Sequence, residues 1–125
     1  MQSRLDVVVG IVRDATDRIL INQRRPGAHL EGLWEFPGGK RRAGEERETA
    51  LKRELDEELG IEIVAAEPLL NLRHDYPDRL VHLDVWSVLE YVGEPRACES
   101  QVIAWVRPEE MSHIDLLPAD SPIVA

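Results

Sequence analysis

The stretch from Gly39 to Ile61 constrains this chain most, because it holds four glutamates, an arginine and two glycines at fixed spacings. These spaced residues are Gly39, Glu45, Arg53, Glu54, Glu57, Glu58 and Gly60. Between them leucines recur every four residues, which is typical of a helix with one apolar stripe, and a glycine directly after such a stripe commonly ends the helix. We therefore expect a helix over residues 46–59 that packs its leucines against a core.

Three of the glutamates gather on one side of this expected helix. Glu54, Glu57 and Glu58 stand at i, i+3 and i+4, so they project together next to the apolar stripe. Like charges placed in this way destabilise a bare helix by about 0.2–0.5 kcal/mol per pair. A solvated charged face is the ordinary explanation for a glutamate-rich run, but this spacing favours a bound cation. Carboxylate oxygens are the ligands that Mg²⁺ and Mn²⁺ prefer, so we expect a site for Mg²⁺, or for Mn²⁺.

Length and composition limit what this site can serve. A chain of 125 residues fits one domain, which we expect over residues 1–125 with a C-terminal helix that is cut short. It has no apolar run of membrane-spanning length, no secretory signal and only one cysteine, so we expect a cytoplasmic protein without a membrane partner. The net charge of −9 argues against a nucleic acid polymer as partner, whereas a free nucleotide can arrive with divalent cations that neutralise it.

The rest of the chain alternates strand and helix patterns. Strands are expected at residues 5–13, 18–23, 33–36, 61–74, 80–91 and 102–106, and a short helix from Pro108. The second strand is expected to pair with the first as a hairpin, and the third to end at a Pro-Gly-Gly loop. Strands interleaved with a few helices indicate an α/β protein with a mixed sheet between helices.

The pattern from Gly39 to Ile61 resembles the signature of the Nudix hydrolase family at every position. The resemblance implies that family's fold, an α/β/α sandwich with a mixed β-sheet, and metal-dependent cleavage of a diphosphate. It also implies that Arg53 orients a neighbouring carboxylate and that Glu54 or Glu57 is the general base, a choice that the sequence leaves open. The metal ligands implied by position are Glu54, Glu57, Glu58, the carbonyl of Gly38 and, from a later loop, Glu99.

Segments outside this signature are similar to the MutT-like subgroup of the family. They include residues 33–40, 76–79, 93–95 and 117–125. The positions that hold the nucleotide in that subgroup are matched here by Arg24, Phe36, Asp78, Arg79 and Asp120. The resemblance implies Mg²⁺-dependent hydrolysis of oxidised nucleoside triphosphates such as 8-oxo-dGTP to monophosphate and pyrophosphate. It implies a small-molecule nucleotide as partner, and a monomer or weak dimer.

Asp120 departs from that subgroup, which carries asparagine at this position. An ionised aspartate only accepts hydrogen bonds, and it can accept from the N7–H that oxidation at C8 creates on guanine. A protonated Asp120 can also donate, and so can pair with cytosine. The alternative is therefore a pyrophosphohydrolase for cytidine-type or modified pyrimidine triphosphates. A further alternative is a non-catalytic lesion-recognition module, although such a module would not need all four signature glutamates.

Overall fold

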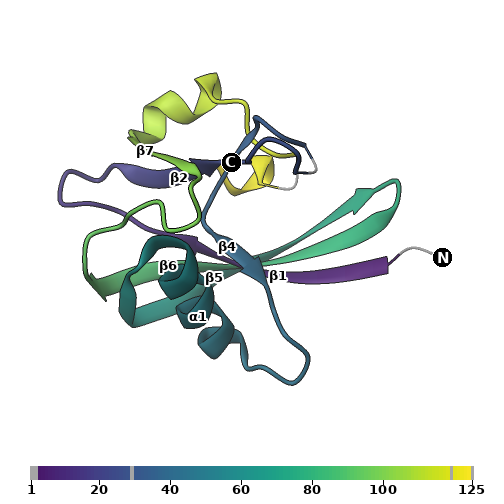
Figure 1. Cartoon of the computed structure of the whole chain (residues 1–125), viewed down its shortest axis with the longest axis horizontal. Coiled ribbons are helices and arrows are strands. Elements are labelled where there is room, and N and C mark those ends of the chain that lie inside the picture. The colour runs from purple at the N-terminus through teal and green to yellow at the C-terminus, as the bar shows by residue number, and fades with distance from the viewer. Residues whose placement is uncertain (1–2, 29, 119, 125) are drawn as a thin grey trace.

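The strands of this protein form two sheets, and their order brings the predicted site residues together (Figure 1). The computed structural model describes residues 3–28, 30–118 and 120–124. Its elements are β1 (Ser3–Ile11), β2 (Ile19–Gln23), β3 (Trp34–Glu35), β4 (Gly38–Lys40), α1 (Arg47–Leu59), β5 (Glu62–Tyr76), β6 (Arg79–Val92), β7 (Val102–Val106) and the 3₁₀ helices η1 (Pro108–His113) and η2 (Ser121–Val124). One sheet has the order β4-β1-β6-β5 and the other β3-β2-β7. Strand β1 is parallel to β6 and antiparallel to β4, so the larger sheet is mixed, as expected.

Both faces of the larger sheet are buried. Successive residues of a strand point to opposite faces. Val8 of β1 accordingly packs in a cluster with the leucines of α1, whereas its neighbour Val9 packs in a second cluster with Ile21 and with Met111 of η1. The sheet therefore lies between α1 on one side and a 3₁₀ helix with the smaller sheet on the other, which confirms the α/β prediction.

No helix in the part of the chain that the structure describes is long and apolar enough to cross a membrane.

Helix α1 begins and ends where the leucine period and the glycine indicated. Leu51, Leu55 and Leu59 are fully buried against the sheet. Gly60 takes the left-handed conformation with φ 70°, and its N–H donates to the carbonyl of Asp56 at 2.9 Å. This C-cap satisfies a carbonyl that the last turn of a helix leaves without a partner.

The expected hairpin between the first two strands forms only next to the turn, where Asp14 N–H donates to Arg18 O and Leu20 N–H donates to Val12 O, both at 3.0 Å. β1 and β2 belong to different sheets, and among the described residues they are joined by an isolated bridge between Arg13 and Ile19. The carboxylate of Asp14 turns the chain here, because it accepts hydrogen bonds from Thr16 and Arg18. Both edges of β1 are already occupied by β4 and β6, so β2 pairs with β3 and β7 instead.

The later strands agree with the sequence pattern. β5 and β6 form one long antiparallel hairpin, which projects to the right in Figure 1, and β7 has the predicted bounds. The short helix expected from Pro108 is the 3₁₀ helix η1. The segment expected to open a further helix forms the 3₁₀ helix η2 in the described residues. These two 3₁₀ helices place the C-terminal segment beside the smaller sheet.

Candidate active site

Two glycines let strand β4 approach its neighbours closely, Gly38 on the side of β1 and Gly39 on the side of α1. A Cβ atom on Gly38 would collide with the carbonyl oxygen of Val8 on β1, and one on Gly39 would collide with the carboxylate of Glu54 on α1. Gly38 is therefore needed for close backbone approach, whereas a side chain at position 39 would force the Glu54 carboxylate to move. The Pro-Gly-Gly segment thus sets the carboxylate of Glu54 directly against the backbone of β4.

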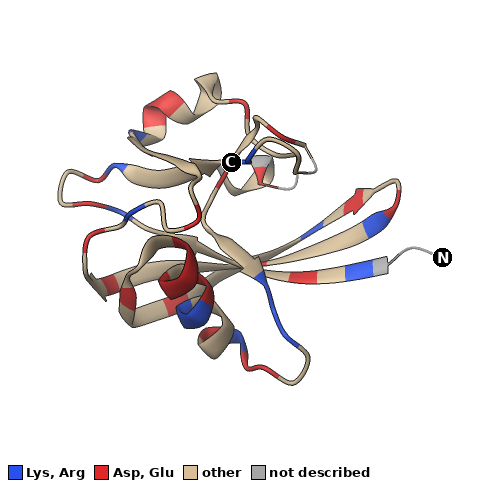
Figure 2. Ribbon diagram, in the orientation of Figure 1, with Lys and Arg blue, Asp and Glu red and all other residues tan. Residues whose placement is uncertain are grey.

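A cavity of about 170 Å³ beside this contact is strongly acidic. Four carboxylates from three parts of the chain line it together with two arginines, and the carboxylates are Glu35, Glu54, Glu58 and Glu99. Figure 2 shows acidic residues grouped on α1, which supplies two of the four. Gly38, the other predicted metal ligand, also lines this cavity. The structure therefore brings together, around one cavity, residues from well-separated parts of the sequence.

Burial and mutual repulsion change the ionisation of these carboxyl groups. Only 6% of Glu58 is exposed, and burial raises its pKa to about 8, with further contributions from the negative charges of Glu35 and Glu99. The backbone N–H of Gly38 donates to Glu58 and acts in the opposite direction. Burial also raises the pKa of Glu54, against the effect of Arg53. Oxygen donors that destabilise one another's charged forms fit a divalent cation, which would remove that repulsion.

Arg53 organises the carboxylates beside the cavity. Its guanidinium donates to both oxygens of Glu45, at 2.7 and 2.9 Å, and to one oxygen of Glu54 at 2.9 Å. It also donates to the carbonyl of Lys40 on β4 at 3.0 Å. The hydrogen bonds from Arg53 lower the pKa of Glu45 to about 2 and raise the pKa of Arg53 itself. Glu45 therefore anchors Arg53, and Arg53 in turn fixes one oxygen of Glu54.

Glu57 occupies a different position from the other predicted metal ligands. Its side chain is 46% exposed, and its nearest cations are Arg53 at 3.3 Å and Arg42 at 3.7 Å. It is not among the described residues that line the acidic cavity. Glu57 therefore lies at the rim, whereas Glu54 and Glu58 face the interior.

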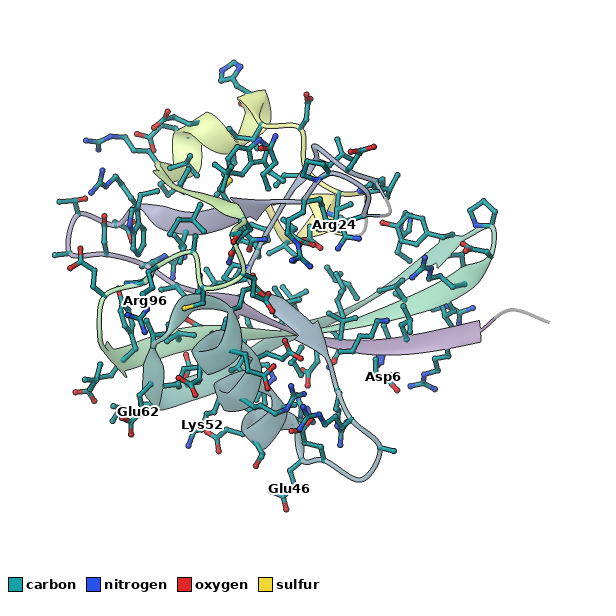
Figure 3. The ribbon with its side chains drawn as sticks, viewed as in Figure 1. Asp6, Arg24, Glu46, Lys52, Glu62 and Arg96 are labelled. Atoms are coloured by element: carbon teal, nitrogen blue, oxygen red, sulfur yellow. The ribbon has the colours of Figure 1, made fainter. Side chains whose placement is uncertain are left out.

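A second cavity, of about 290 Å³, adjoins the acidic one. Aliphatic side chains of β1 and β6 form much of its wall, and four predicted substrate residues line it as well, namely Arg24, Phe36, Arg79 and Asp120. Figure 3 shows Arg24 above β4 in the view, on the side of the smaller sheet. Asp78 is largely exposed and contacts Arg79 at 3.7 Å, so the structure places it outside the described lining. Arg24, Glu35 and Gly38 line both cavities, which makes them two compartments of one site.

Asp120 is the polar group most deeply set in this second cavity. Only 4% of it is exposed, and its Oδ2 accepts a hydrogen bond from the backbone N–H of Phe36 at 2.9 Å. Burial raises the pKa of Asp120 to about 7, although the Phe36 N–H favours the ionised form. Near neutral pH this group therefore changes between a pure acceptor and a group that also donates.

Sequence reasoning missed three residues of the site, Glu35, Asn22 and Gln101. Burial raises the pKa of Glu35, whose carboxylate lies 3.5 Å from Arg24 and accepts a hydrogen bond from Asn22 at 3.3 Å. Gln101 donates to the carbonyl of Glu58 at 3.0 Å and accepts from the N–H of Glu99 at 2.9 Å. A single charge inside the apolar run of residues 33–36 was the available signal for Glu35. Nothing in the sequence pattern marked Gln101.

Comparisons with known proteins agree with this geometry. A family model described as a NUDIX domain matches residues 8–125. A CTP pyrophosphohydrolase of Escherichia coli (strain K12) is 38% identical over 120 residues, which are 96% of this chain and 88% of that protein. An 8-oxo-dGTP diphosphatase of the same organism is 37% identical over 122 residues, which are 98% of this chain and 95% of that protein.

Solved structures show the same similarity. A structure from a study of MutT from Aliivibrio salmonicida and Vibrio cholerae superimposes with a TM-score of 0.83 at 32% identity. The match covers 98% of this chain and 94% of that one. The acidic cavity, its signature residues and these similarities lead to one assignment, that this chain belongs to the Nudix hydrolase family.

Proposed function

We propose that this chain hydrolyses nucleoside triphosphates to the monophosphate and pyrophosphate, with Mg²⁺ or Mn²⁺ as cofactor, within a single domain over residues 1–125. The observation that carries the proposal is the joining of two compartments through Arg24, Glu35 and Gly38. The larger compartment has mostly apolar walls and one deeply buried carboxyl group, that of Asp120, which can form hydrogen bonds with a base. This combination suits a nucleobase. The smaller has carboxylates, which suit cation-bound phosphates. Such a substrate belongs to the cytoplasmic pool of free nucleotides, and each compartment is formed by one copy of the chain.

The residues of the acidic cavity have different roles in the proposed reaction. Glu54, Glu58, Glu99 and the carbonyl of Gly38 would hold the cation, which supplies charge neutralisation and a more acidic water when bound. Arg53 fixes one oxygen of Glu54, and the buried contact with β4 limits the other. This restraint keeps the carboxylate oriented toward the phosphates, as displacement at phosphorus requires.

Glu54 is the better candidate for the general base. Burial raises its pKa, which makes its carboxylate a stronger proton acceptor than an exposed glutamate, and it lines the cavity. Glu57 is half-exposed at the rim and its charge is shared with two arginines. We assign to Glu54 the transfer of a proton from the attacking water, and to Glu57 support of the cation at the entrance.

Asp120 selects the substrate in this scheme. An ionised Asp120 accepts from the N7–H of 8-oxoguanine and meets a lone pair on normal guanine, so we propose 8-oxo-dGTP as the preferred substrate class. A second candidate, cytidine-type triphosphates, is favoured by the pKa of about 7, because a protonated Asp120 pairs with the N3 and amino group of cytosine. A site built to pair a polar edge rejects an unmatched base by about 10⁴- to 10⁵-fold, so rates should separate the two candidates.

The test is a panel of normal, oxidised and methylated nucleoside triphosphates, each with Mg²⁺ and with chelator, in water labelled with heavy oxygen. We expect Mg²⁺-dependent release of pyrophosphate that carries the label, which indicates attack at the β-phosphorus. Label in the monophosphate would contradict that route. Binding of an oxidised nucleotide without turnover would instead favour the recognition-module alternative.

A further inference from the structure

Asn22 is a buried polar residue that directly follows three buried apolar residues of β2. Only 4% of it is exposed, and the residues before it on β2, Leu20 and Ile21, are fully buried. Strand alternation places Asn22 on the side of Leu20, which packs in the α1 cluster, and opposite to Ile21. A buried amide destabilises a fold unless its polar atoms are hydrogen-bonded, so its presence here requires an explanation.

The Nδ2 atom of this amide has a hydrogen-bond partner in Glu35. Asn22 and Glu35 face each other in the β2–β3 register, and Nδ2 donates to Oε1 of Glu35 at 3.3 Å. The opposite orientation would set Oδ1 against that carboxylate, where two acceptors repel. Glu35 therefore fixes which way the amide points.

The other polar atom of the amide, Oδ1, belongs to a residue that lines the acidic cavity. Asn22 lines this cavity together with Glu54, Glu58 and Glu99, and its Oδ1 is buried without a hydrogen-bond partner in the part of the chain that the structure describes. A buried acceptor that stays unpaired has lost its hydrogen bond to water without replacement, which destabilises the fold. No described side chain donates to this oxygen, and the glutamates around it become pure acceptors once a divalent cation holds them in the ionised form.

We propose that Asn22 is a positioning residue of the acidic cavity: its Nδ2 holds Glu35, and its Oδ1 accepts a hydrogen bond from a water molecule of the bound divalent cation. Mg²⁺ and similar hard cations retain waters, whose protons point outward to acceptors around the site. The inference rests on the proposed function for the presence of a cation. It adds Asn22 to the cation site as a residue that lies outside the Nudix signature and does not itself bind the cation.

The test measures Mn²⁺ affinity in the absence of nucleotide, from the electron paramagnetic resonance signal of free Mn²⁺. Asn22→Leu keeps the approximate shape of the side chain and removes both polar atoms. We expect it to weaken Mn²⁺ binding about 10- to 100-fold, the usual effect of losing an outer partner of a metal site. Asn22→Asp keeps an acceptor oxygen and should bind Mn²⁺ at least as well as the wild type.

A matched control separates this role from simple core packing. Ile21→Val trims the adjacent residue on the opposite face of β2, so it should lower thermal stability slightly and leave Mn²⁺ affinity unchanged. If Asn22→Leu does not give the wild-type circular dichroism spectrum, Asn22→Ala provides the same comparison.

The outcomes distinguish this inference from the proposed function. A wild-type chain that binds no Mn²⁺ would remove the cation from the proposed function itself. Wild-type binding that Asn22→Leu and Asn22→Ala leave within twofold would overturn the inference on Asn22 alone. Equal losses in Asn22→Asp and Asn22→Leu would also overturn it, because the aspartate retains the acceptor.

Discussion

The acidic cavity and the larger cavity, which we propose holds the nucleoside and therefore call the nucleoside cavity, are built from the chain in different ways. The acidic cavity takes two of its carboxylates from one turn of α1, and a glycine loop and an arginine hold them. The nucleoside cavity is assembled from β1, β6, the end of β2 and the segment near η2. Asp120 and Phe36, which meet there, are 84 positions apart in the sequence.

This difference means that the residues proposed for catalysis and the residues proposed for base recognition lie on different parts of the fold. A reacting group must keep its geometry within a fraction of an ångström, and a helix held by buried leucines provides that rigidity. Base recognition depends on one or two polar groups at the ends of loops, where a substitution changes the hydrogen-bond pattern without disturbing the core. A single exchange at position 120 therefore alters the expected substrate while the catalytic face stays intact.

The largest expected effect separates two glutamates of the same helix. Glu54→Gln keeps the size of the side chain and removes the proposed base, so kcat should fall about 10²- to 10⁴-fold. Glu57→Gln, its matched control at the rim, should raise the Mg²⁺ concentration needed for half-maximal rate about tenfold and leave kcat at saturating Mg²⁺ close to that of the wild type. Steady-state kinetics over a range of Mg²⁺ concentrations up to saturation measure both. A larger loss in Glu57→Gln would reverse the roles, and near-normal turnover in both would exclude the scheme.

The free energy of unfolding should fall as pH rises, because the carboxyl groups of Glu58 and Asp120 are buried. The folded-state pKa values of Glu58 and Asp120 are raised to about 8 and about 7, so the folded chain binds more protons than the unfolded chain between roughly pH 4 and 8. Their contribution is present at low pH and is lost as pH rises through these values. With chelator present, we expect the free energy of unfolding to fall on the order of 6 kcal/mol from pH 5 to 8.5.

Thermal melts across that pH range measure this change, and each 1 kcal/mol corresponds to a few degrees in Tm. Mn²⁺ should restore stability above pH 7, where it binds the ionised glutamates. Glu58→Gln, which cannot ionise, should flatten the curve. A chelated wild-type chain whose Tm rises steadily to pH 8.5 would contradict the burial argument.

Substrate preference should titrate with Asp120. With a pKa of about 7, the ratio of ionised to protonated Asp120 rises about 100-fold from pH 6 to 8. The kcat/KM ratio of 8-oxo-dGTP over CTP should rise by a similar factor, because one substrate uses the acceptor and the other the donor. Asp120→Asn carries both functions at every pH, so its ratio should stay flat. A flat ratio in the wild type would exclude Asp120 as the selective group.

The smallest expected effect concerns Gln101, which ties the Glu99 loop to the last turn of α1. Gln101→Leu removes hydrogen bonds to the carbonyl of Glu58 and the N–H of Glu99, so Mn²⁺ affinity should fall roughly threefold, the effect of about one neutral hydrogen bond. Discrimination between nucleobases should not change, because Gln101 lies outside the described lining of the nucleoside cavity. Loss of discrimination in this variant would show that the two compartments are not separable.

Local patterns predicted the parts of the molecule that depend on local physics. The bounds of α1 and the burial of Leu51, Leu55 and Leu59 follow from a period and a glycine cap, and both are confirmed. Strand pairing is non-local, so the sequence could not indicate that β2 leaves β1 for the smaller sheet. Asn22 and Glu35 escaped notice for the same reason, because their importance arises only when β2 and β3 pair.

Glu35 stands in the wall that separates the two compartments and faces both of them. A ligand in one compartment that changes the electrostatic environment of this carboxylate therefore also changes the electrostatic potential in the other compartment. Thermodynamic linkage makes the effect reciprocal: if a well-seated base tightens the hold on the cation by some factor, the cation tightens the hold on that base by the same factor. Correct seating of a damaged base would then itself favour the loaded, reactive form of the enzyme.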